Sequence, residues 1–272
     1  MESTQRILIT GGAGKVAALL RPLMQRPRRV LRLLDIKEPS DVAPGEEVIV
    51  GSLTDPATLQ QALLGVDAIV HLGGQSRESD ARDVIETNIY GTYLLLEEAR
   101  RQGIKRVVIA SSNHAAGFYT RSEADEPLPA GLAGRGDTLY GWSKVAMEAC
   151  GRLYADRFGM DVICLRIGLW FPVPPGLRGL AMWLSPADGA RLVEASLGAE
   201  SPGFRIVWGI SHNTRRWWSL AEGEAIGYLP QDDAEEYADK LIAEHGEPDF
   251  LNDPILNRVG GQWCDVPLGQ SY

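Results

Sequence analysis

The chain has 272 residues, of which 44% are hydrophobic and 23% are charged, the balance of an ordinary globular protein with one large domain or a domain and a small lobe. Its 36 acidic and 27 basic residues give a formal net charge of -9, so we expect no nucleic-acid-binding surface. The 3 cysteines are widely spaced and form no CxxC pattern, which argues against a zinc site and a disulfide framework and favours a reducing compartment.

We expect neither a signal peptide nor a membrane-spanning segment. The N-terminal residues lack a basic start, an apolar stretch and a small-residue cleavage site. No apolar run approaches the ~18 residues that cross a bilayer. Together with the cysteine pattern, this predicts a cytoplasmic protein without a membrane partner.

The first strand–helix junction of the chain carries a glycine turn. Residues 6–10 form a short apolar run, and a helical pattern opens at Val16, with Gly11 and Gly14 before it and Ala17 after it. Glycines at such a turn let the backbone approach a pyrophosphate, and the helix N-terminus supplies free N–H groups and a positive dipole end. The spacing predicts a dinucleotide site, with an ordinary strand–helix turn as the alternative.

A second apolar strand, residues 30–34, ends at Asp35. An acidic residue roughly 20 positions after the glycine turn is the expected partner of the adenosine ribose hydroxyls. Its charge would repel a 2′-phosphate, so NAD is favoured over NADP. The alternative is a solvated carboxylate at a strand end.

Strands and helices then alternate strictly as far as Arg166. Further strands are expected at 47–50, 66–72, 105–110 and 161–166, and helices near residue 54 and over 83–103 and 140–159. A looser region over 117–137 should be a surface loop bordering a pocket. The alternation predicts an α/β fold, a Rossmann-type doubly wound parallel sheet.

After residue 168 the pattern changes. A loop over 171–176, a helix start at Ser185 and a seventh strand over 205–208 precede an aromatic-rich remainder. We expect an NAD-binding domain over 1–168 and a smaller substrate-binding region over 169–272, packed on each other as one structural unit. The clustered aromatic residues are expected to pack rather than to form a sugar platform; they are Trp217, Trp218, Tyr228 and Trp263.

Two strand ends carry residues suited to a site. The strand over 66–72 contains His71, expected to be a buried strand histidine with a satisfied ring nitrogen, and closes at Gly73 and Gly74, where the backbone could lie against a nucleotide. The fifth strand ends in a Ser-Ser-Asn-His run over 111–114. Polar side chains at the end of a central strand are where an open α/β sheet places its site.

Tyr140 and Lys144 stand four residues apart in the first turns of a predicted helix. At that spacing their side chains share one face. An adjacent ammonium favours a phenolate, so the pair predicts a tyrosine of lowered pKa that exchanges a proton with a substrate hydroxyl. A chance Tyr-x-x-x-Lys pair is the alternative, and the glycine turn, Asp35 and the Ser-Ser-Asn-His run favour the catalytic interpretation.

Together these segments resemble the extended short-chain dehydrogenase/reductase superfamily, which includes the NAD-dependent epimerases and dehydratases. The wider resemblance rests on residues 10–14, Asp35, 71–74, 110–114 and 140–144. Within it, the chain resembles the uronate dehydrogenases from residue 6 to about residue 265. This narrower resemblance rests on residues 111–114, 166–168, Arg178, 183–188, 207–209 and 217–218.

The resemblance implies a dehydrogenase of carbohydrate metabolism that uses NAD to oxidise C1 of a hexuronic acid, such as glucuronate or galacturonate, to the aldarolactone. It implies Tyr140 as general base, Lys144 on the nicotinamide ribose and Ser112 on the reacting hydroxyl. The implied substrate-binding residues are Ser76, Ser112, Asn113, His114, Tyr140 and Arg178. The implied cofactor-binding residues are Gly11, Gly14, Lys15, Val16, Asp35, Ile36, Ser52, Leu53, Leu72, Gly73, Gly74, Asn88, Ser111, Tyr140, Lys144 and Ile167.

Arg178 also has an argument of its own. A guanidinium binds a carboxylate through two parallel hydrogen bonds, and on an acidic chain one placed arginine must do this locally. The alternative is a solvated loop arginine. Two positions depart from the family pattern, because Ser52 replaces an aspartate near the adenine and Leu169 replaces a serine facing the sugar, which leaves the exact sugar acid open.

Two other functions remain open at this point. The first is a nucleotide-sugar epimerase, dehydratase or reductase of the same superfamily, although only about 100 residues follow Arg166 and they hold no basic cluster for a diphosphate. The second is a catalytically silent NAD-binding regulatory protein, although this chain retains both Tyr140 and Lys144. By analogy, the helices over 83–103 and 140–159 predict a homodimer or a multiple of it.

Overall fold

The fold is organised around a parallel sheet of seven strands in the order β3-β2-β1-β4-β5-β6-β9. The computed structural model describes residues 4–123 and 127–271, so residues 1–3 of the signal-peptide expectation and 124–126 of the predicted loop lie outside the described residues. The strands are β1 Gln5–Thr10, β2 Arg29–Asp35, β3 Glu46–Val50, β4 Ala68–His71, β5 Arg106–Ser112, β6 Asp161–Ile167 and β9 Phe204–Gly209. The order reverses between β1 and β4, which pair in parallel with Thr10 opposite His71. Ligand sites of doubly wound sheets form at this reversal.

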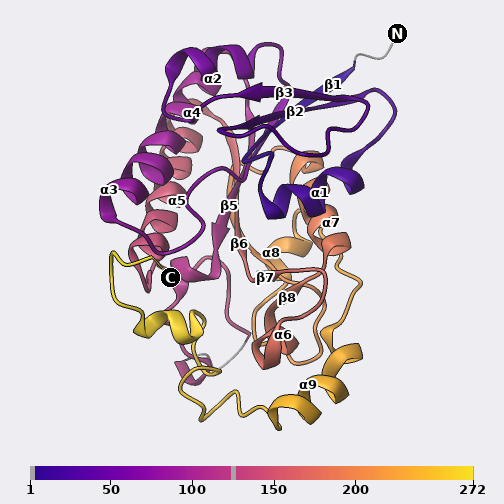
Figure 1. The fold of residues 1–272 in the computed structure, drawn as a ribbon, viewed down its shortest axis with the longest axis vertical. Helices are drawn as coiled ribbons and strands as arrows, with labels where there is room; N and C mark the ends of the chain where they lie inside the picture. Colours follow the sequence, from indigo (N-terminus) through magenta and orange to yellow (C-terminus); the bar gives the residue numbers. More distant parts are fainter. Residues whose placement is uncertain (1–3, 124–126, 272) are drawn as a thin grey trace.

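Helices cover both faces of the sheet (Figure 1). Helices α1 and α7 pack together on one face, and α2, α4 and α5 cover the other. The helices that cover the sheet are α1 Lys15–Met24, α2 Pro56–Leu63, α4 Gly91–Arg101, α5 Leu139–Phe158 and α7 Pro186–Gly198. The others are α3 Ala81–Val84, α6 Gly176–Met182, α8 Ala221–Glu224, α9 Ala238–His245 and the 3-10 turns Asn113–Ala116, Arg121–Glu123, Ala234–Tyr237 and Gly261–Asp265. The Rossmann-type α/β fold predicted from the alternation of elements is confirmed.

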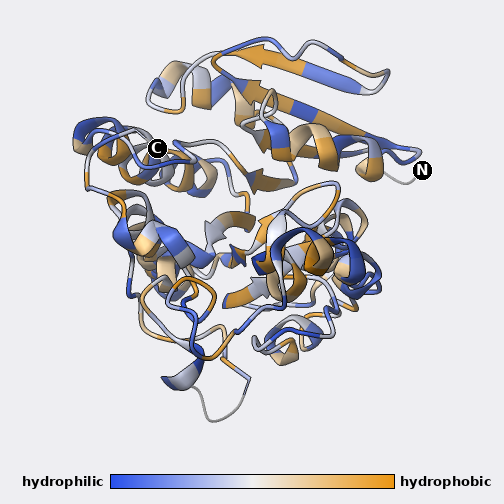
Figure 2. Cartoon of the chain, turned by 60° about the horizontal axis from the view of Figure 1, so that its bottom comes forward, coloured by the Kyte–Doolittle hydropathy of each residue, from blue (hydrophilic) through white to orange (hydrophobic). Residues whose placement is uncertain are grey.

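The central strand β1 is buried on both faces. Ile7 and Ile9 belong to the core beneath α1 and α7, whereas Leu8 belongs to the core beneath α2, α4 and α5. All three side chains are fully buried. A strand that alternates between two cores reads as a continuous apolar run, which is why its sequence lacks a polar face. In Figure 2 the strands of the sheet show long orange stretches, with blue segments on the outer strands.

The helix predicted over 83–103 is interrupted. A π-helical segment, Ile85–Tyr90, joins α3 to α4, and the Gly91 amide donates to the carbonyl of Glu86, five residues back. π segments are often found at functional sites. Here the segment places the fully buried Asn88 amide against the Gln75 backbone and Ser143. Helical periodicity alone does not reveal the extra residue.

The region beyond residue 168 both extends the sheet and adds a lower lobe. Strand β9 pairs with β6, while β7 Leu169–Trp170 and β8 Trp183–Leu184 form a separate small sheet. The division at residue 168 stays a prediction. Trp217 and Trp218 are buried and stack with ring centroids 4.0 Å apart, so their predicted packing role is confirmed. No helix within the described ranges has the length and apolarity needed to span a membrane.

Candidate active site

The glycine turn lies at the reversal of the strand order. Gly11 has a φ of +69°, and a Cβ added there would lie 2.8 Å from the Gly73 amide nitrogen, so the turn packs directly on the loop after β4. Within the described chain, no side chain caps α1 at Gly14, which leaves its first-turn amides, including those of Lys15 and Val16, facing this point. Ala17 is fully buried against the strands, as predicted for close helix–strand packing.

Asp35 ends β2 beside the glycine turn. Its Oδ2 accepts from the Ala13 amide at 3.0 Å and its Oδ1 from the Lys37 amide at 3.2 Å. The carboxylate therefore has a defined direction while staying partly exposed. This is the arrangement needed for a ribose diol beside the turn. Neighbouring Ile36 is exposed, and Ser52 lies after β3 with its hydroxyl on that of Thr54.

A buried chain of hydrogen bonds runs behind the loop after β4, where Gly73 and Gly74 are predicted to bind the cofactor. The Gly73 amide donates to the Thr10 hydroxyl, which lies 2.7 Å from His71 Nδ1. His71 Nε2 lies 2.9 Å from the Thr92 hydroxyl, which donates to the Asn88 carbonyl. Because the Thr92 hydrogen is used in that bond, Nε2 of His71 must be the donor and Nδ1 the acceptor.

His71 is therefore a neutral structural histidine. Burial, followed by the nearby charge of Lys144, lowers its pKa to about 3. The expectation of a satisfied strand histidine is confirmed. The chain continues through Asn88, whose Nδ2 donates to the Ser143 hydroxyl, and Ser143 donates to the carbonyl of Tyr140. The loop after β4 and helix α5 thus share one hydrogen-bonded support.

Helix α5 presents the predicted proton-transfer pair. The Thr138 hydroxyl caps it by accepting from the Gly141 amide at 2.9 Å, and Gly159, at a φ of +64°, ends it. Lys144 Nζ lies 5.5 Å from the centroid of the Tyr140 ring, so the two side chains share a face as predicted. Lys144 Nζ also donates to the Ala110 carbonyl at 2.8 Å, which ties it to the end of β5.

Burial determines the protonation of this pair. It raises the pKa of Tyr140 to about 12, with a smaller opposing effect from the hydrogen bond with Ser112. It lowers the pKa of Lys144 to about 8, opposed by the carboxylate of Glu148. The predicted lowering of the Tyr140 pKa by Lys144 is therefore wrong for this structure, because desolvation of the phenol outweighs an ammonium 5.5 Å from its ring.

A buried ion pair lies one turn further along α5. Both nitrogens Nε and Nη2 of Arg166 donate to Glu148, at 2.9 and 2.8 Å, and the Ser111 hydroxyl donates to the same carboxylate at 2.6 Å. The Ser111 hydroxyl is therefore used to support Glu148. The role of Ser111 in cofactor binding stays a prediction. Glu148 escaped prediction, although its position four residues after Lys144 places it on the same helix face.

The Ser-Ser-Asn-His run turns from β5 into a buried 3-10 segment. The Ser112 hydroxyl donates to Asn113 Oδ1 at 3.3 Å and accepts from the His114 amide at 3.2 Å. His114 Nδ1 lies 2.7 Å from the buried carboxylate of Asp137. The Trp263 ring stacks on His114 with a centroid distance of 4.3 Å and lies 5.9 Å from Tyr140. These groups therefore surround the phenol on one side.

Arg178 is brought to the same side of the site. Its Nη2 donates to the Val259 carbonyl at 2.7 Å and contacts the sulfur of Met182 at 3.2 Å, and Asn113 Nδ2 donates to the same carbonyl at 2.9 Å. Among the described residues no carboxylate pairs with Arg178. Burial lowers its pKa to about 10, and it still carries its charge at neutral pH. The Asp137 carboxylate opposes this effect through its charge without forming an ion pair, so the guanidinium can still bind an external carboxylate.

Comparison with known proteins places the chain. The family described as the NAD dependent epimerase/dehydratase family matches residues 7–173. The chain belongs to this family.

The similarity to individual members covers nearly the whole chain. The uronate dehydrogenase of Pseudomonas putida is 38% identical over 260 residues, which cover 95% of each chain. A mutant uronate dehydrogenase of Agrobacterium tumefaciens, solved in complex with NAD, is 34% identical with a TM-score of 0.88 and covers 98% of this chain and 99% of its own. A glucuronic acid dehydrogenase structure from Chromohalobacter salexigens is also 34% identical, with a TM-score of 0.90 over 97% of this chain and 98% of its own.

The other residues predicted to bind the substrate or the cofactor make fewer contacts that test their roles. Ser76 is exposed, and its side chain has no hydrogen bond within the described ranges. The amide of Asn88 is fully used by Gln75 and Ser143, so it supports the loop. Leu169 is partly buried in β7 opposite Trp183. Four more predicted cofactor residues line the strand ends, namely Leu53, Leu72, Gly74 and Ile167.

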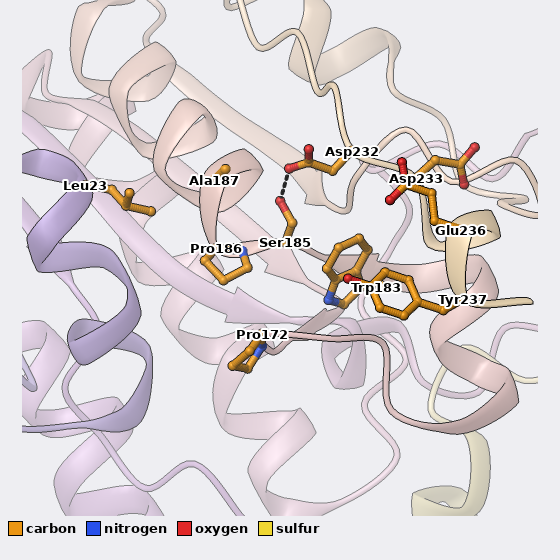
Figure 3. Close-up of a pocket in the computed structure, with 10 residues that line it drawn as sticks. All are labelled: Leu23, Pro172, Trp183, Ser185, Pro186, Ala187, Asp232, Asp233, Glu236 and Tyr237. Atoms are coloured by element: carbon orange, nitrogen blue, oxygen red, sulfur yellow. Dashed lines mark hydrogen bonds between the residues drawn. The ribbon is translucent and has the colours of Figure 1, made fainter. Parts of the chain in front are cut away.

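A cavity of about 320 Å³ lies away from this site, between α1, α7 and the turn over 234–237 (Figure 3). Two of the three carboxylates that line it, those of Asp232 and Asp233, already have internal partners. Ser185 donates to Asp232, as the dashed line in Figure 3 shows, and Asp233 accepts from the amide and the hydroxyl of Thr214. Neither Tyr140 nor Arg178 lines this cavity, so it is separate from the site around Tyr140.

Proposed function

We propose that this protein oxidises the C1 hydroxyl of a hexuronic acid, such as glucuronate or galacturonate, to the aldarolactone with NAD. The observation that carries the proposal is the placement of Arg178. It shares the Val259 carbonyl with Asn113, and Asn113 adjoins the hydroxyl-binding Ser112. A substrate of this site should therefore carry a carboxylate at one end and a reactive hydroxyl at the other. The similarity to uronate dehydrogenases supports the same substrate class.

The residues at the reversal of the strand order fit NAD. The close approach of Gly11 to Gly73 bares the backbone, and the uncapped start of α1 offers amides for a pyrophosphate. Asp35 offers a carboxylate for the ribose hydroxyls and disfavours a 2′-phosphate. Bound NAD would supply the acceptor for the hydride that leaves C1.

Tyr140 acts as the general base in this proposal. The C1 hydroxyl gives its proton to the phenolate oxygen of Tyr140, while the hydroxyl of Ser112 orients the reacting oxygen. Lys144 is held on Ala110 and directed at the same face as the phenol. Because burial raises the pKa of Tyr140 to about 12, the fraction of phenolate, and with it the rate of oxidation, should increase with pH.

His114 is assigned to hydrogen bonding rather than to proton transfer. Its Nδ1 is occupied by Asp137, which fixes the ring and leaves Nε2 for a sugar hydroxyl. Asn113 Oδ1 accepts from Ser112 while its Nδ2 is taken by Val259, so Asn113 acts by orienting Ser112. The pocket is thus built from short polar side chains on one strand end.

The test compares substrates by the formation of NADH. With NAD present, glucuronate or galacturonate should give NADH, and a UDP-sugar should give neither NADH nor an epimerised product. Turnover of the UDP-sugar alone would favour the nucleotide-sugar epimerase or dehydratase. Binding of NAD without turnover of any sugar would favour the silent regulatory protein.

We further propose that the protein is a cytoplasmic homo-oligomer. Tyr90, Tyr93 and Leu153 lie on neighbouring helices, namely the π-helical segment Ile85–Tyr90, α4 and α5. They are 49%, 44% and 54% exposed. Such a surface would be covered by a second copy related by a two-fold axis. Sedimentation of the protein should give at least twice the 29.7 kDa mass of one chain, and Leu153→Glu should reduce it.

A further inference from the structure

The turn over 259–261 closes the substrate side of the site from far along the chain. The Val259 amide donates to the Tyr119 carbonyl, and the Gly260 amide donates to the Gly117 carbonyl, both at 2.9 Å. Arg121 donates from its amide to the carbonyl of Asn257 at 2.9 Å. These bonds clamp the turn to the segment that follows the Ser-Ser-Asn-His run, so the turn has a defined position relative to Ser112.

Two adjacent glycines in this turn touch functional side chains. A Cβ at Gly260 would lie 2.0 Å from Oδ2 of Asp137, the oxygen that holds His114. A Cβ at Gly261 would lie 2.5 Å from the guanidinium carbon of Arg178, 2.6 Å from its Nε and 2.7 Å from its Nη1. Real Cβ atoms do not approach so closely, so the guanidinium occupies space that only a glycine leaves open.

The conformation of Gly261 gives a second reason for glycine. Its φ of +59° lies in the left-handed region, where other residues are strained. This conformation brings the bare Cα of the turn against the guanidinium while the Val259 carbonyl accepts from Nη2. The turn over 259–261 thus accepts a hydrogen bond from Nη2 of Arg178 and, at Gly261, leaves the space that Nε and Nη1 occupy.

We propose that Gly261 is a positioning residue that sets the recognition of the substrate carboxylate by holding the guanidinium of Arg178 in place. The turn supplies one acceptor for Nη2 and leaves Nε and Nη1, which have no hydrogen-bond partner among the described residues. The N–H groups of these two nitrogens are therefore available to the substrate carboxylate. This inference rests on the proposed function, in which Arg178 binds the carboxylate of a uronate.

The structure offers a matched control for the strain. Gly203 has a φ of +61°, and nothing lies within 4 Å of an added Cβ there. It lies before β9, where its amide donates to Asp161. Gly203→Ala therefore places an alanine at nearly the same positive φ as Gly261→Ala without displacing a functional side chain.

The test measures kinetics of the whole protein with glucuronate and NAD. Gly261→Ala should raise KM for glucuronate about 10–100-fold while KM for NAD stays within about twofold, because only the carboxylate contact moves. Gly203→Ala should change neither constant. In the Arg178→Met background, Gly261→Ala should add no further loss, since the group that it displaces is gone.

Three results would overturn the inference: an unchanged KM for glucuronate in Gly261→Ala, an equal loss in Gly203→Ala, or a full additional loss in the Arg178→Met background. A crystal structure of Gly261→Ala gives a readout independent of activity. The inference expects the guanidinium to leave the Val259 carbonyl, and an undisplaced guanidinium contradicts it. If the wild-type protein forms no NADH with any uronate, the proposed function fails, and this structure still decides the role of Gly261.

Discussion

The two sides of the site are stabilised in different ways. On the cofactor side, at the ends of β1 and β4, every polar group of the buried chain from Gly73 through His71 to Asn88 is paired. On the substrate side, no described carboxylate forms an ion pair with Arg178, and Asp137 acts on it only through its charge at a longer distance. Buried groups that are all paired stabilise a scaffold, whereas a guanidinium with two nitrogens still available can bind a ligand.

The two sides also differ in the distance along the chain that their contacts span. The cofactor side joins neighbouring strands and the helix packed on them. The substrate side depends on Val259, which lies 81 residues after Arg178 and 146 residues after Asn113. We therefore expect substitutions on the cofactor side to lower stability first, and those on the substrate side to lower activity first.

Tyr140→Phe provides the largest expected effect. It removes the proposed proton acceptor but keeps the ring, so kcat should fall by about 10²–10⁴ while NAD binding and the melting temperature change little. Tyr228→Phe is the matched control, since its buried hydroxyl donates to the Ile210 carbonyl outside the site. That variant should lose a little stability and no turnover. Retained turnover in Tyr140→Phe would remove the phenol from the mechanism.

Lys144 lies between the two sides, and the pH dependence of its contribution to stability measures how far it is desolvated. Burial lowers its pKa from 10.5 to about 8, so the unfolded chain binds its proton more tightly between these values. The stability contributed by this group is therefore present above pH 10.5 and lost as the pH falls through about 8. Relative to Lys144→Met, the wild-type free energy of unfolding should rise by about 3 kcal/mol over this window.

Denaturant unfolding of both proteins at several pH values measures this difference, in which the titration of groups that do not interact with Lys144 cancels. A wild-type advantage that does not change between pH 8 and 10.5 would mean that Lys144 is solvated. The boundary between the two sides would then be open to water.

The smallest expected effect is the loss of stability in Thr92→Val, a substitution on the cofactor side. It leaves the Nε2 hydrogen of His71 without an acceptor, which should cost about 1–3 kcal/mol of unfolding free energy. Thr92→Ser keeps the hydroxyl and should recover most of that loss. Turnover of the folded Thr92→Val protein should stay close to wild type. A loss of kcat without a loss of stability would contradict the distinction between the two sides.

Most of the cofactor side could be predicted because its signals are local. The glycine turn, Asp35 at the end of β2 and the Tyr140–Lys144 spacing each lie within a few residues of an expected strand or helix end. The buried role of His71 also followed from its place inside an apolar run. The raised pKa of Tyr140 was not foreseen, since the extent of its burial depends on tertiary packing rather than on the spacing to Lys144.

The substrate side was predicted in part. Arg178, Asn113 and His114 were named, but their supports were not, because Asp137 and the turn over 259–261 meet them only in the folded chain. A glycine pair late in the sequence has no local motif to mark it. Trp263 was assigned to packing, and it does stack, yet on His114 at the edge of the site.

The most direct test compares two substrates that differ only in the carboxylate. NADH formation is measured with glucuronate and with glucose, for the wild-type protein and for Arg178→Met. The wild-type protein should prefer glucuronate in kcat/KM by about 10²-fold or more, and Arg178→Met should remove most of that preference while NAD binding stays intact. Equal activity on both sugars in the wild type, or a preference that survives Arg178→Met, would contradict a site built around a uronate carboxylate.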